Sequence, residues 1–526
     1  MASWSFHRIR TARIWWILAP VALWLGWTAW SLDVEYYDGF EALCNARAML
    51  GQDADYNPIR APLMALLQLP AVWLHGTWQL HPLDVRLPHA LMAFLHLGAL
   101  ALVLRQIVRH IEDPAARWVA ALGAVLTPLW ASYAPFISHD ILPGALFLFL
   151  LHGAERERRR PSPWNLLLLV VVGAALPLIK HVYALCWVVV LVGVALVRDG
   201  GAAGNLRPGR LLTRLLLAAL GSALFTLVVM GAALGDSLGE APLLLRPLLQ
   251  VQAIRQGYAD AGMVFPWWVY LRNLPAQGWL VALLLVPALV IGWREKGAGR
   301  RLAVAWVGFF VGLQAMPGRE VRYLLVLAPL TAMLLARVWP LVRRWRGLQA
   351  ALVLVLAWSA IETTTAAAQF RDPFYLHSSY RTLLQPLEAR QPGTRTVLAF
   401  HQLSLPPAMP SPWAGDRGSY LFHLSPEHVR VLYGIPARQV LHLPPQELSA
   451  SAGTLVDGDL IIFSNTVLIN DLGFWPSPPP ELSQEPGFHQ WLARRRSSAS
   501  AADARTPSGF ELLSWCDATG CSRRQP

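Results

Sequence analysis

Long apolar runs recur through the first two thirds of this chain, and most are close to 20 residues long. At 1.5 Å per residue such a run crosses a hydrocarbon core of about 30 Å as a helix. Hydrophobic residues make up 55% of the chain and charged residues only 14%, which excludes an ordinary soluble globular protein, a disordered chain and a secreted disulfide scaffold. The sequence predicts a polytopic α-helical membrane protein.

We expect about eleven membrane-spanning helices, the first an N-terminal anchor because its Trp-rich run has no small-residue cleavage site behind it. The expected spans are residues 14–32, 87–104, 118–134, 141–154, 164–179, 181–197, 211–234, 275–293, 302–316, 322–337 and 348–366.

Every second loop between these spans is strongly basic, which predicts the side of the membrane on which each loop lies. The basic loops are 105–117, 156–160, 198–214, 294–301 and 337–346, and they are predicted to be cytoplasmic together with the N-terminus. Only the opposite loops are long, at 33–86 and 235–274. We therefore expect the chemistry on the outer face of the membrane, which is the periplasmic face of a bacterial inner membrane if the cell is Gram-negative. The net charge of +12 comes from these loops, and the chain lacks the basic, aromatic stripe typical of nucleic-acid binding.

A change of composition divides the chain into a membrane module, residues 1–366, and a second domain, residues 367–526. The second domain has 13 Arg and 13 acidic residues, is rich in Pro, Ser and Gly, and contains short apolar segments at 396–400, 439–443 and 459–464 that predict strands. With a helix expected near 487–496, this indicates an extracytoplasmic α/β domain, periplasmic if the odd number of spans is correct.

Four cysteines are present, of which two lie in the second domain. Cys516 and Cys521 are five residues apart and are candidates for a disulfide in an oxidising compartment, although two free thiols remain the alternative. The other two lie in the membrane module, so a four-cysteine zinc site is not expected.

Acidic residues begin the first outer loop, directly after the first span: Asp33, Glu35, Asp38 and Glu41. They are ordinary surface acids of a wet loop, or one of them is a general base or a metal ligand at the membrane surface. At the second outer loop, His139 and Asp140 start the next apolar run. Asp140 could simply cap that helix, and this role is compatible with a catalytic one.

A single lysine, Lys180, interrupts the apolar residues between two spans at the outer side. The chain uses 42 Arg and only two Lys, which suggests that this position needs a compact ammonium group suited to a phosphate; a snorkelling side chain is the alternative. Arginines at the outer side run against the basic-loop pattern and favour an anionic partner, either lipid headgroups or a bound phosphate. They are Arg60, Arg255, Arg272, Arg319 and Arg322.

Several short motifs together resemble the multi-spanning C-class glycosyltransferases, in the branch of the protein O-mannosyltransferases and the lipid A aminoarabinose transferase. The matching residues, in chain order, are Asp38, Ala46-Arg47-Ala48-Met49-Leu50, Arg60-Ala61-Pro62-Leu63, Asp140, Lys180, residues 265–275 and residues 322–336. The resemblance covers about residues 10–366. It departs from the family where an acidic pair becomes Asp38-Gly39 and where a motif lysine becomes Arg60, so Asp33 or Glu35 remains an alternative base.

The resemblance implies a glycosyltransferase that moves a sugar, with inversion, from a polyprenyl-phosphate donor to an acceptor on the outer face: lipid A or core glycan, another glycan, or protein. It implies Asp38 as general base, Asp140 and Lys180 as further catalytic residues, and donor phosphate binding by Lys180, Arg60, Arg272, Arg319 and Arg322. A divalent metal on Asp38, Asp140 and His139 is an option that the family leaves open.

Two other classes share part of this pattern. A transporter or flippase of lipid-linked saccharides would have similar hydropathy, but it normally places polar, broken helices at the bilayer midplane, often in repeated halves, and neither is evident here. A noncatalytic assembly subunit would leave the outer acids and Lys180 without a role. The sequence therefore favours the transferase.

Overall fold

The computed structural model describes most of residues 13–368 and four strands between residues 396 and 514. Within the first part, residues 33–34, 36, 53–59, 81–83, 198–207, most of 235–267, 296 and 317–320 are outside the described residues. The described part is mostly helical, which confirms the predicted class of polytopic helical membrane protein.

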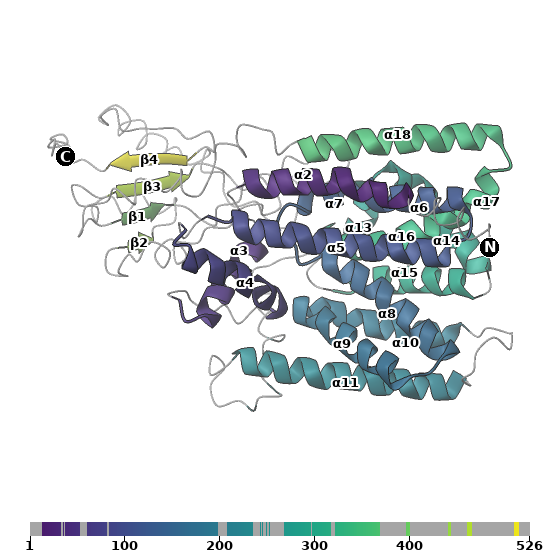
Figure 1. Cartoon of the computed structure of the whole chain (residues 1–526), viewed down its shortest axis with the longest axis horizontal. Helices are drawn as coiled ribbons and strands as arrows, with labels where there is room; N and C mark the ends of the chain where they lie inside the picture. Colours follow the sequence, from purple (N-terminus) through teal and green to yellow (C-terminus); the bar gives the residue numbers. More distant parts are fainter. Residues whose placement is uncertain are drawn as a thin grey trace, which may run out of the picture.

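Helices run along the bundle's long axis, and two of them, α3 and α4, lie at the end that faces the sheet (Figure 1). The α-helices are α2 (Leu18–Ser31), α3 (Tyr37–Met49), α4 (Leu63–Thr77), α5 (Arg86–His110), α6 (Pro114–Val125), α7 (Pro128–Tyr133), α8 (Ile141–Arg159), α9 (Pro163–Ile179), α10 (Leu185–Leu196), α11 (Pro208–Leu234), α13 (Val269–Arg272), α14 (Trp279–Arg294), α15 (Ala298–Gln314), α16 (Ala328–Leu335), α17 (Trp339–Val342) and α18 (Arg346–Ala368). Short 3-10 segments are η1 (Arg13–Ile17), η2 (His181–Ala184), η4 (Leu274–Gln277), η5 (Val321–Leu327) and η6 (Ala336–Val338).

Five described segments are long and apolar enough to cross a membrane: Ile14–Ser31, Arg86–His110, Pro208–Ala233, Val321–Val342 and Arg346–Ala368. Four shorter apolar helices accompany them: Leu63–Thr77, Pro163–Ile179, His181–Leu196 and Trp279–Arg294. The coarse prediction of a many-helix membrane module is confirmed, whereas the number of eleven spans stays a prediction.

The predicted span 118–134 is not one helix, which corrects the sequence analysis. It breaks into α6 and α7 at Thr127, which has the extended angles φ −122° and ψ 103°. The next residue is Pro128, whose ring lacks an N–H and disfavours helical angles in the residue before it. The break bends the chain toward the segment that carries His139 and Asp140.

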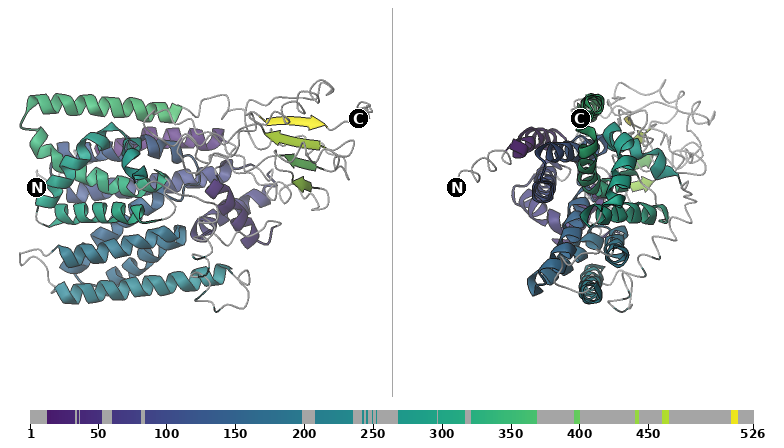
Figure 2. Two further views of the ribbon diagram at one scale, coloured as in Figure 1. Left: turned by 180° about the vertical axis from the view of Figure 1, so that it is seen from behind. Right: turned by 90° about the vertical axis from the view of Figure 1, so that its right-hand side faces the viewer.

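The centre of the bundle is formed by η5 and α16, which are buried along their whole length. By contrast, α11 and α18 lie on opposite sides of the bundle (Figure 2) and present rows of apolar side chains outward. Exposed Leu217, Leu220 and Leu224 on α11, with Val353 and Leu354 on α18, are examples. An apolar outer surface around a closely packed core is what a bilayer solvent requires.

Ion pairs sort the loops into two groups, as the predicted alternation requires. Loops predicted to be cytoplasmic pair with each other: Arg301 contacts Glu155 at 3.1 Å, and Arg337 contacts Glu295 at 3.0 Å. Residues at the predicted outer ends of the spans meet in the separate cluster described below. Which end faces the periplasm stays a prediction.

Four strands form one sheet in the order β2-β1-β3-β4, beyond the α3 end of the bundle (Figures 1 and 2). They are β1 (Thr396–Ala399), β2 (Val440–His442), β3 (Leu460–Ser464) and β4 (Phe510–Ser514). β1 pairs in parallel with β2 and β3, and β4 is antiparallel to β3. The three predicted strands are therefore present, and β4 was not predicted. The helix expected at 487–496 and the cysteine pair Cys516 and Cys521 lie outside the described residues, so the α/β character of this domain stays a prediction.

Candidate active site

Five charged side chains that are far apart in the sequence meet at the end of the bundle that carries α3. Each stands at the end of an element or in a turn: Asp38 in the first turn of α3, Arg60 before α4, Asp140 before α8, Lys180 after α9 and Arg322 in η5. Helix ends can expose charged groups to water without placing them in hydrocarbon. Five of the predicted outer-face residues thus form one cluster.

Asp38 lies at the centre of this cluster, and it is only 1% exposed. Its Oδ1 is 2.9 Å from Nη1 of Arg60, and its Oδ2 is 2.9 Å from Nη2 of Arg322 and 3.3 Å from Nζ of Lys180. Arg60 also donates through Nε to the Glu41 carboxylate, one helical turn after Asp38. A buried carboxylate is thereby surrounded by three cations.

Asp140 is fully buried and shares two of these cations. Its Oδ1 is 3.5 Å from Nζ of Lys180, and its Oδ2 is 3.4 Å from Nε of Arg322. The Tyr183 hydroxyl donates a hydrogen bond to Oδ1. Asp140 stands at the N-cap position of α8, yet its side chain makes no capping hydrogen bond there. The capping alternative is therefore wrong for its carboxylate, which faces the cations.

Lys180 ends α9 and turns into the cluster between the two carboxylates. Its ammonium group also lies 4.2 Å from the centre of the Tyr323 ring, a cation–π distance. The side chain is mostly buried, at 15% exposure. The snorkelling alternative is wrong, because the ammonium is held by two acids and an aromatic face.

Electrostatics keep Asp38 charged in spite of its burial. Desolvation raises the pKa of this carboxyl, but Arg322, Arg60 and Lys180 together outweigh it and hold the pKa well below its usual value. His139 lies beside the cluster, where burial lowers its pKa to about 4. At neutral pH the site therefore combines ionised Asp38 with a neutral imidazole.

The other candidates in the first outer loop are separated by the structure. Glu35 is fully buried and is bound to His89 and to a backbone amide. Glu41 is bound to Arg60. Asp33 lies outside the described residues. Of the described acids, Asp38 and Asp140 are the ones that share Lys180 and Arg322.

A divalent metal does not fit the residues present. Among the described residues, no group of three His, Cys, Asp or Glu side chains is arranged to hold a metal ion. The oxygen atoms of Asp38 and Asp140 that would ligate one are already neutralised by Arg60, Lys180 and Arg322. Asp38, Asp140 and His139 therefore do not form the metal site considered above.

Three of the predicted phosphate-binding arginines lie beyond what the structure describes. Arg255 and Arg319 are outside the described residues, as is the side chain of Arg272 at the end of α13. Their roles stay predictions.

Two tyrosines of the site were missed by sequence reasoning. Tyr183 follows Lys180 by three residues, and Tyr323 directly follows Arg322. A spacing of three places two side chains on one side of a helical turn, so the position of Tyr183 relative to Lys180 could have been used to predict it as a site residue. For Tyr323 no sequence signal separates a site residue from an ordinary core aromatic.

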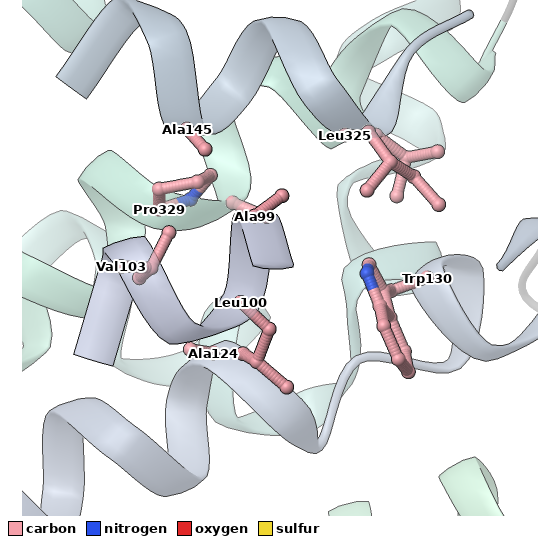
Figure 3. Close-up of a pocket in the computed structure, with 10 residues that line it drawn as sticks. Ala99, Leu100, Val103, Ala124, Trp130, Ala145, Leu325 and Pro329 are labelled. Atoms are coloured by element: carbon pink, nitrogen blue, oxygen red, sulfur yellow. The ribbon is translucent and has the colours of Figure 1, made fainter. Parts of the chain in front are cut away.

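An apolar pocket lies inside the helical bundle (Figure 3). Its walls come from α5, α6, α7, α8, η5 and α16, through Ala99, Leu100, Val103, Ala124, Trp130, Ile141, Ala145, Leu325, Ala328 and Pro329. Ile141 directly follows Asp140, and Leu325 lies one turn after Arg322. Its lining residues are thus all hydrophobic, and two of them closely follow Asp140 and Arg322 in the chain.

The Tyr183→Phe variant tests the hydroxyl bond to Asp140. It keeps the aromatic ring and removes one hydrogen bond to a charged group, so we expect kcat/KM for the reaction proposed below to fall about tenfold. Steady-state kinetics would measure this. Tyr133→Phe removes a hydroxyl from another buried tyrosine, in α7; an equal loss in that control would contradict a specific role for Tyr183.

No family model and no curated protein matches this chain. Its structure does match solved structures of ArnT from Cupriavidus metallidurans. For the apo state the TM-score is 0.53 at 12% sequence identity, over 94% of this chain and 97% of ArnT. For ArnT bound to undecaprenyl phosphate the TM-score is again 0.53 at 12% identity, over 96% of this chain and 99% of ArnT. The chain thus shares its fold with these ArnT structures, as the sequence motifs implied.

Proposed function

We propose that this protein is an inverting glycosyltransferase of the bacterial inner membrane, which moves a sugar from a polyprenyl-phosphate donor to an acceptor hydroxyl on the periplasmic side. The observation that carries the proposal is the buried Asp38 carboxylate surrounded by Arg60, Lys180 and Arg322. The fold it shares with ArnT, one structure of which is bound to undecaprenyl phosphate, supports a donor of this chemical class.

The three cations would bind the donor phosphate. Guanidinium groups present paired donors that match phosphate oxygens, and an ammonium adds a compact point charge. In the described cluster Asp38, Glu41 and Asp140 balance these cations, so a bound phosphate must share them with the carboxylates. Arg272 and Arg319 are proposed to supply further positive charge.

Asp38 would act as the general base. In the free protein its proton affinity is suppressed by the three cations. When a phosphate draws Arg322 and Lys180 toward itself, this suppression weakens and the pKa of Asp38 rises toward the range useful for proton transfer. Donor binding would thereby activate the base only when the reaction can proceed.

The chemical step needs no other group. The acceptor oxygen forms a bond to the anomeric carbon as the bond from that carbon to the phosphate oxygen breaks, with inversion. The hydroxyl proton passes to Asp38. The charge that develops on the departing phosphate is neutralised by Arg60, Lys180 and Arg322.

Asp140 would hold the cations in place rather than react. It contacts Lys180 and Arg322 and accepts a hydrogen bond from the Tyr183 hydroxyl. Fixed positions lower the cost of reorganisation when the phosphate charge develops.

The isoprenoid part of the donor would enter the apolar pocket only if it widens, because its cavity of about 30 Å³ holds little more than a water molecule. Ile141 and Leu325 line that pocket, and its lining carries no charged side chain. The acceptor would be selected by residues 367–526, of which the described strands β1 to β4 lie beyond the same end of the bundle in Figure 1.

Donor turnover in proteoliposomes tests the proposal. Vesicles with the wild-type protein would be given labelled polyprenyl-phosphate sugars and acceptors of three classes, lipid A or core glycan, other glycan, and protein, and the release of polyprenyl phosphate would be measured against empty vesicles. We expect one donor to be consumed. Movement of labelled donor between leaflets without any sugar transfer would contradict the proposal and favour a transporter.

A further inference from the structure

Glu35 and His89 form a buried pair beside the site that the proposed reaction does not use. Both side chains are 0% exposed, and Oε2 of Glu35 is 2.7 Å from Nε2 of His89. His89 belongs to α5, whereas Glu35 lies just before α3, 54 residues earlier in the chain. A buried acid is costly unless its oxygens are satisfied, so this pairing indicates a specific role.

The same carboxylate oxygen also holds the segment that carries Asp140. The Ile137 amide donates to Oε2 of Glu35 at 3.0 Å, three residues before Asp140. Nδ1 of His89 lies 3.3 Å from the Leu32 carbonyl, at the start of the first outer loop. The Glu35–His89 pair therefore connects the segment before Asp38, helix α5 and the segment before Asp140.

Glu35 also fills the space beside the first turn of α3. A side chain at Gly39 would collide with its carboxylate, and Gly39 directly follows Asp38. The Glu35 side chain thus packs against the turn that presents Asp38 on one side and against the Ile137 segment on the other.

We propose that Glu35, clamped by His89, is a positioning residue that sets the distance between Asp38 and Asp140. The inference rests on the proposed function, since these are the base and the cation-holding acid of that reaction. In this role Glu35 holds the turn that presents Asp38, and Asp38 takes up the acceptor proton.

The donors and acceptors of the pair explain why an acid is needed. The Leu32 carbonyl only accepts, so Nδ1 of His89 donates to it, and one proton is then shared between Nε2 and Glu35. A carboxylate oxygen can take part in this bond and still accept from Ile137. A glutamine cannot do both. If its NH₂ group donates to the unprotonated Nε2 of His89, a nitrogen stands where Oε2 of Glu35 stood, and the Ile137 amide finds no acceptor there.

The Glu35→Gln variant should therefore release Ile137 without removing any charged group from the cluster. We expect kcat to fall about 10- to 100-fold, since a misplacement near 1 Å can cost that much, while KM for the donor changes little. Amide hydrogen exchange at Ile137 should become faster in the same variant. A side chain that served only folding would lower the yield of active protein instead of kcat.

A double variant gives a positive test. In Glu35→Gln/His89→Gln the second amide can donate to the oxygen of the first, which is then free to accept from Ile137 as well. We expect this double variant to recover much of the kcat and of the exchange protection that Glu35→Gln alone loses. A further loss on adding the second substitution would overturn the inference.

His96→Asn is the matched control. His96 is another fully buried histidine of α5, and its Nδ1 lies 2.8 Å from the Ala134 carbonyl. Asparagine keeps a donor there, so kcat should stay near the wild-type value. A fall in this control equal to that of Glu35→Gln would overturn the positioning role.

The outcomes separate the inference from the function on which it rests. If the wild type transfers sugar and Glu35→Gln does so equally well, the positioning role is wrong and the proposed function stands. If the wild type transfers no sugar, the proposed function fails, and exchange at Ile137 still decides whether Glu35 holds this segment. Unchanged exchange in Glu35→Gln would then overturn the positioning role too.

Discussion

Replacing Asp38 with asparagine is expected to lower kcat by about 10²- to 10⁴-fold, the range that general-base catalysis contributes. The amide has the same shape but cannot accept the hydroxyl proton. Loss of the Asp38 carboxylate also leaves Arg60, Lys180 and Arg322 without their shared anion. The affinity of the protein for undecaprenyl phosphate should therefore rise or stay unchanged. Turnover and phosphate-lipid binding should be measured on the same preparation.

Two further variants make this prediction specific. Asp84→Asn changes another acid of the first outer loop, one that pairs with Arg86, and should leave kcat near wild type. Asp140→Asn should weaken turnover less than Asp38→Asn, because Asp140 holds the cations and does not take the proton. The reverse order of the two effects would identify Asp140 as the base.

The Arg322→Gln variant should weaken donor binding strongly. Arg322 is 4% exposed and contacts both Asp38 and Asp140, so its removal takes away a phosphate ligand and leaves two buried acids undercompensated. Charge-assisted hydrogen bonds contribute about 1.5 to 3 kcal/mol, which corresponds to a rise in KM for the donor of about 10- to 100-fold. Arg86→Gln, at the exposed partner of Asp84, is the control and should have little effect on KM.

The same variant should change the pH dependence in a defined direction. The pKa of Asp38 is lowered in the folded protein, so its stabilising ion pairs are fully present above its unfolded pKa, 3.8, and are lost only as the pH falls through the lower folded value. Without Arg322 the pKa rises, and loss of stability and of kcat/KM on acidification should begin at a higher pH than in the wild type. If stability and kcat/KM fell at the same pH in the variant and the wild type, this assignment of the cations would be contradicted.

Much of the site could be predicted because its residues lie at the ends of apolar runs. Asp38, Arg60, Asp140, Lys180 and Arg322 each follow or precede an apolar helix on the predicted outer side, and alternating topology alone brings such positions to one end of a bundle. The type of chemistry could be predicted because charged side chains are costly inside a membrane, which marks them as candidate site residues.

The rest depends on side-chain directions that a sequence does not contain. Asp140 stands at a helix N-cap but turns away from the helix, and Glu35 stands three residues before Asp38 but faces His89. Tyr323 is in sequence an ordinary aromatic of an apolar run. Similarly, β4 was missed because a five-residue apolar segment in a polar region has too little periodicity to indicate a strand.

The helices on both sides of Lys180 are short, and this has a consequence for the membrane itself. α9 has 17 residues and rises about 26 Å, and η2 with α10 forms the apolar helix His181–Leu196, which also rises about 26 Å, whereas α5 has 25 residues and rises about 38 Å. Hydrophobic mismatch of this kind is relieved by thinning of the adjacent lipid. The leaflet would therefore dip beside Lys180, and a lipid carrier that diffuses to this position would bring its headgroup down to the protein without leaving the bilayer.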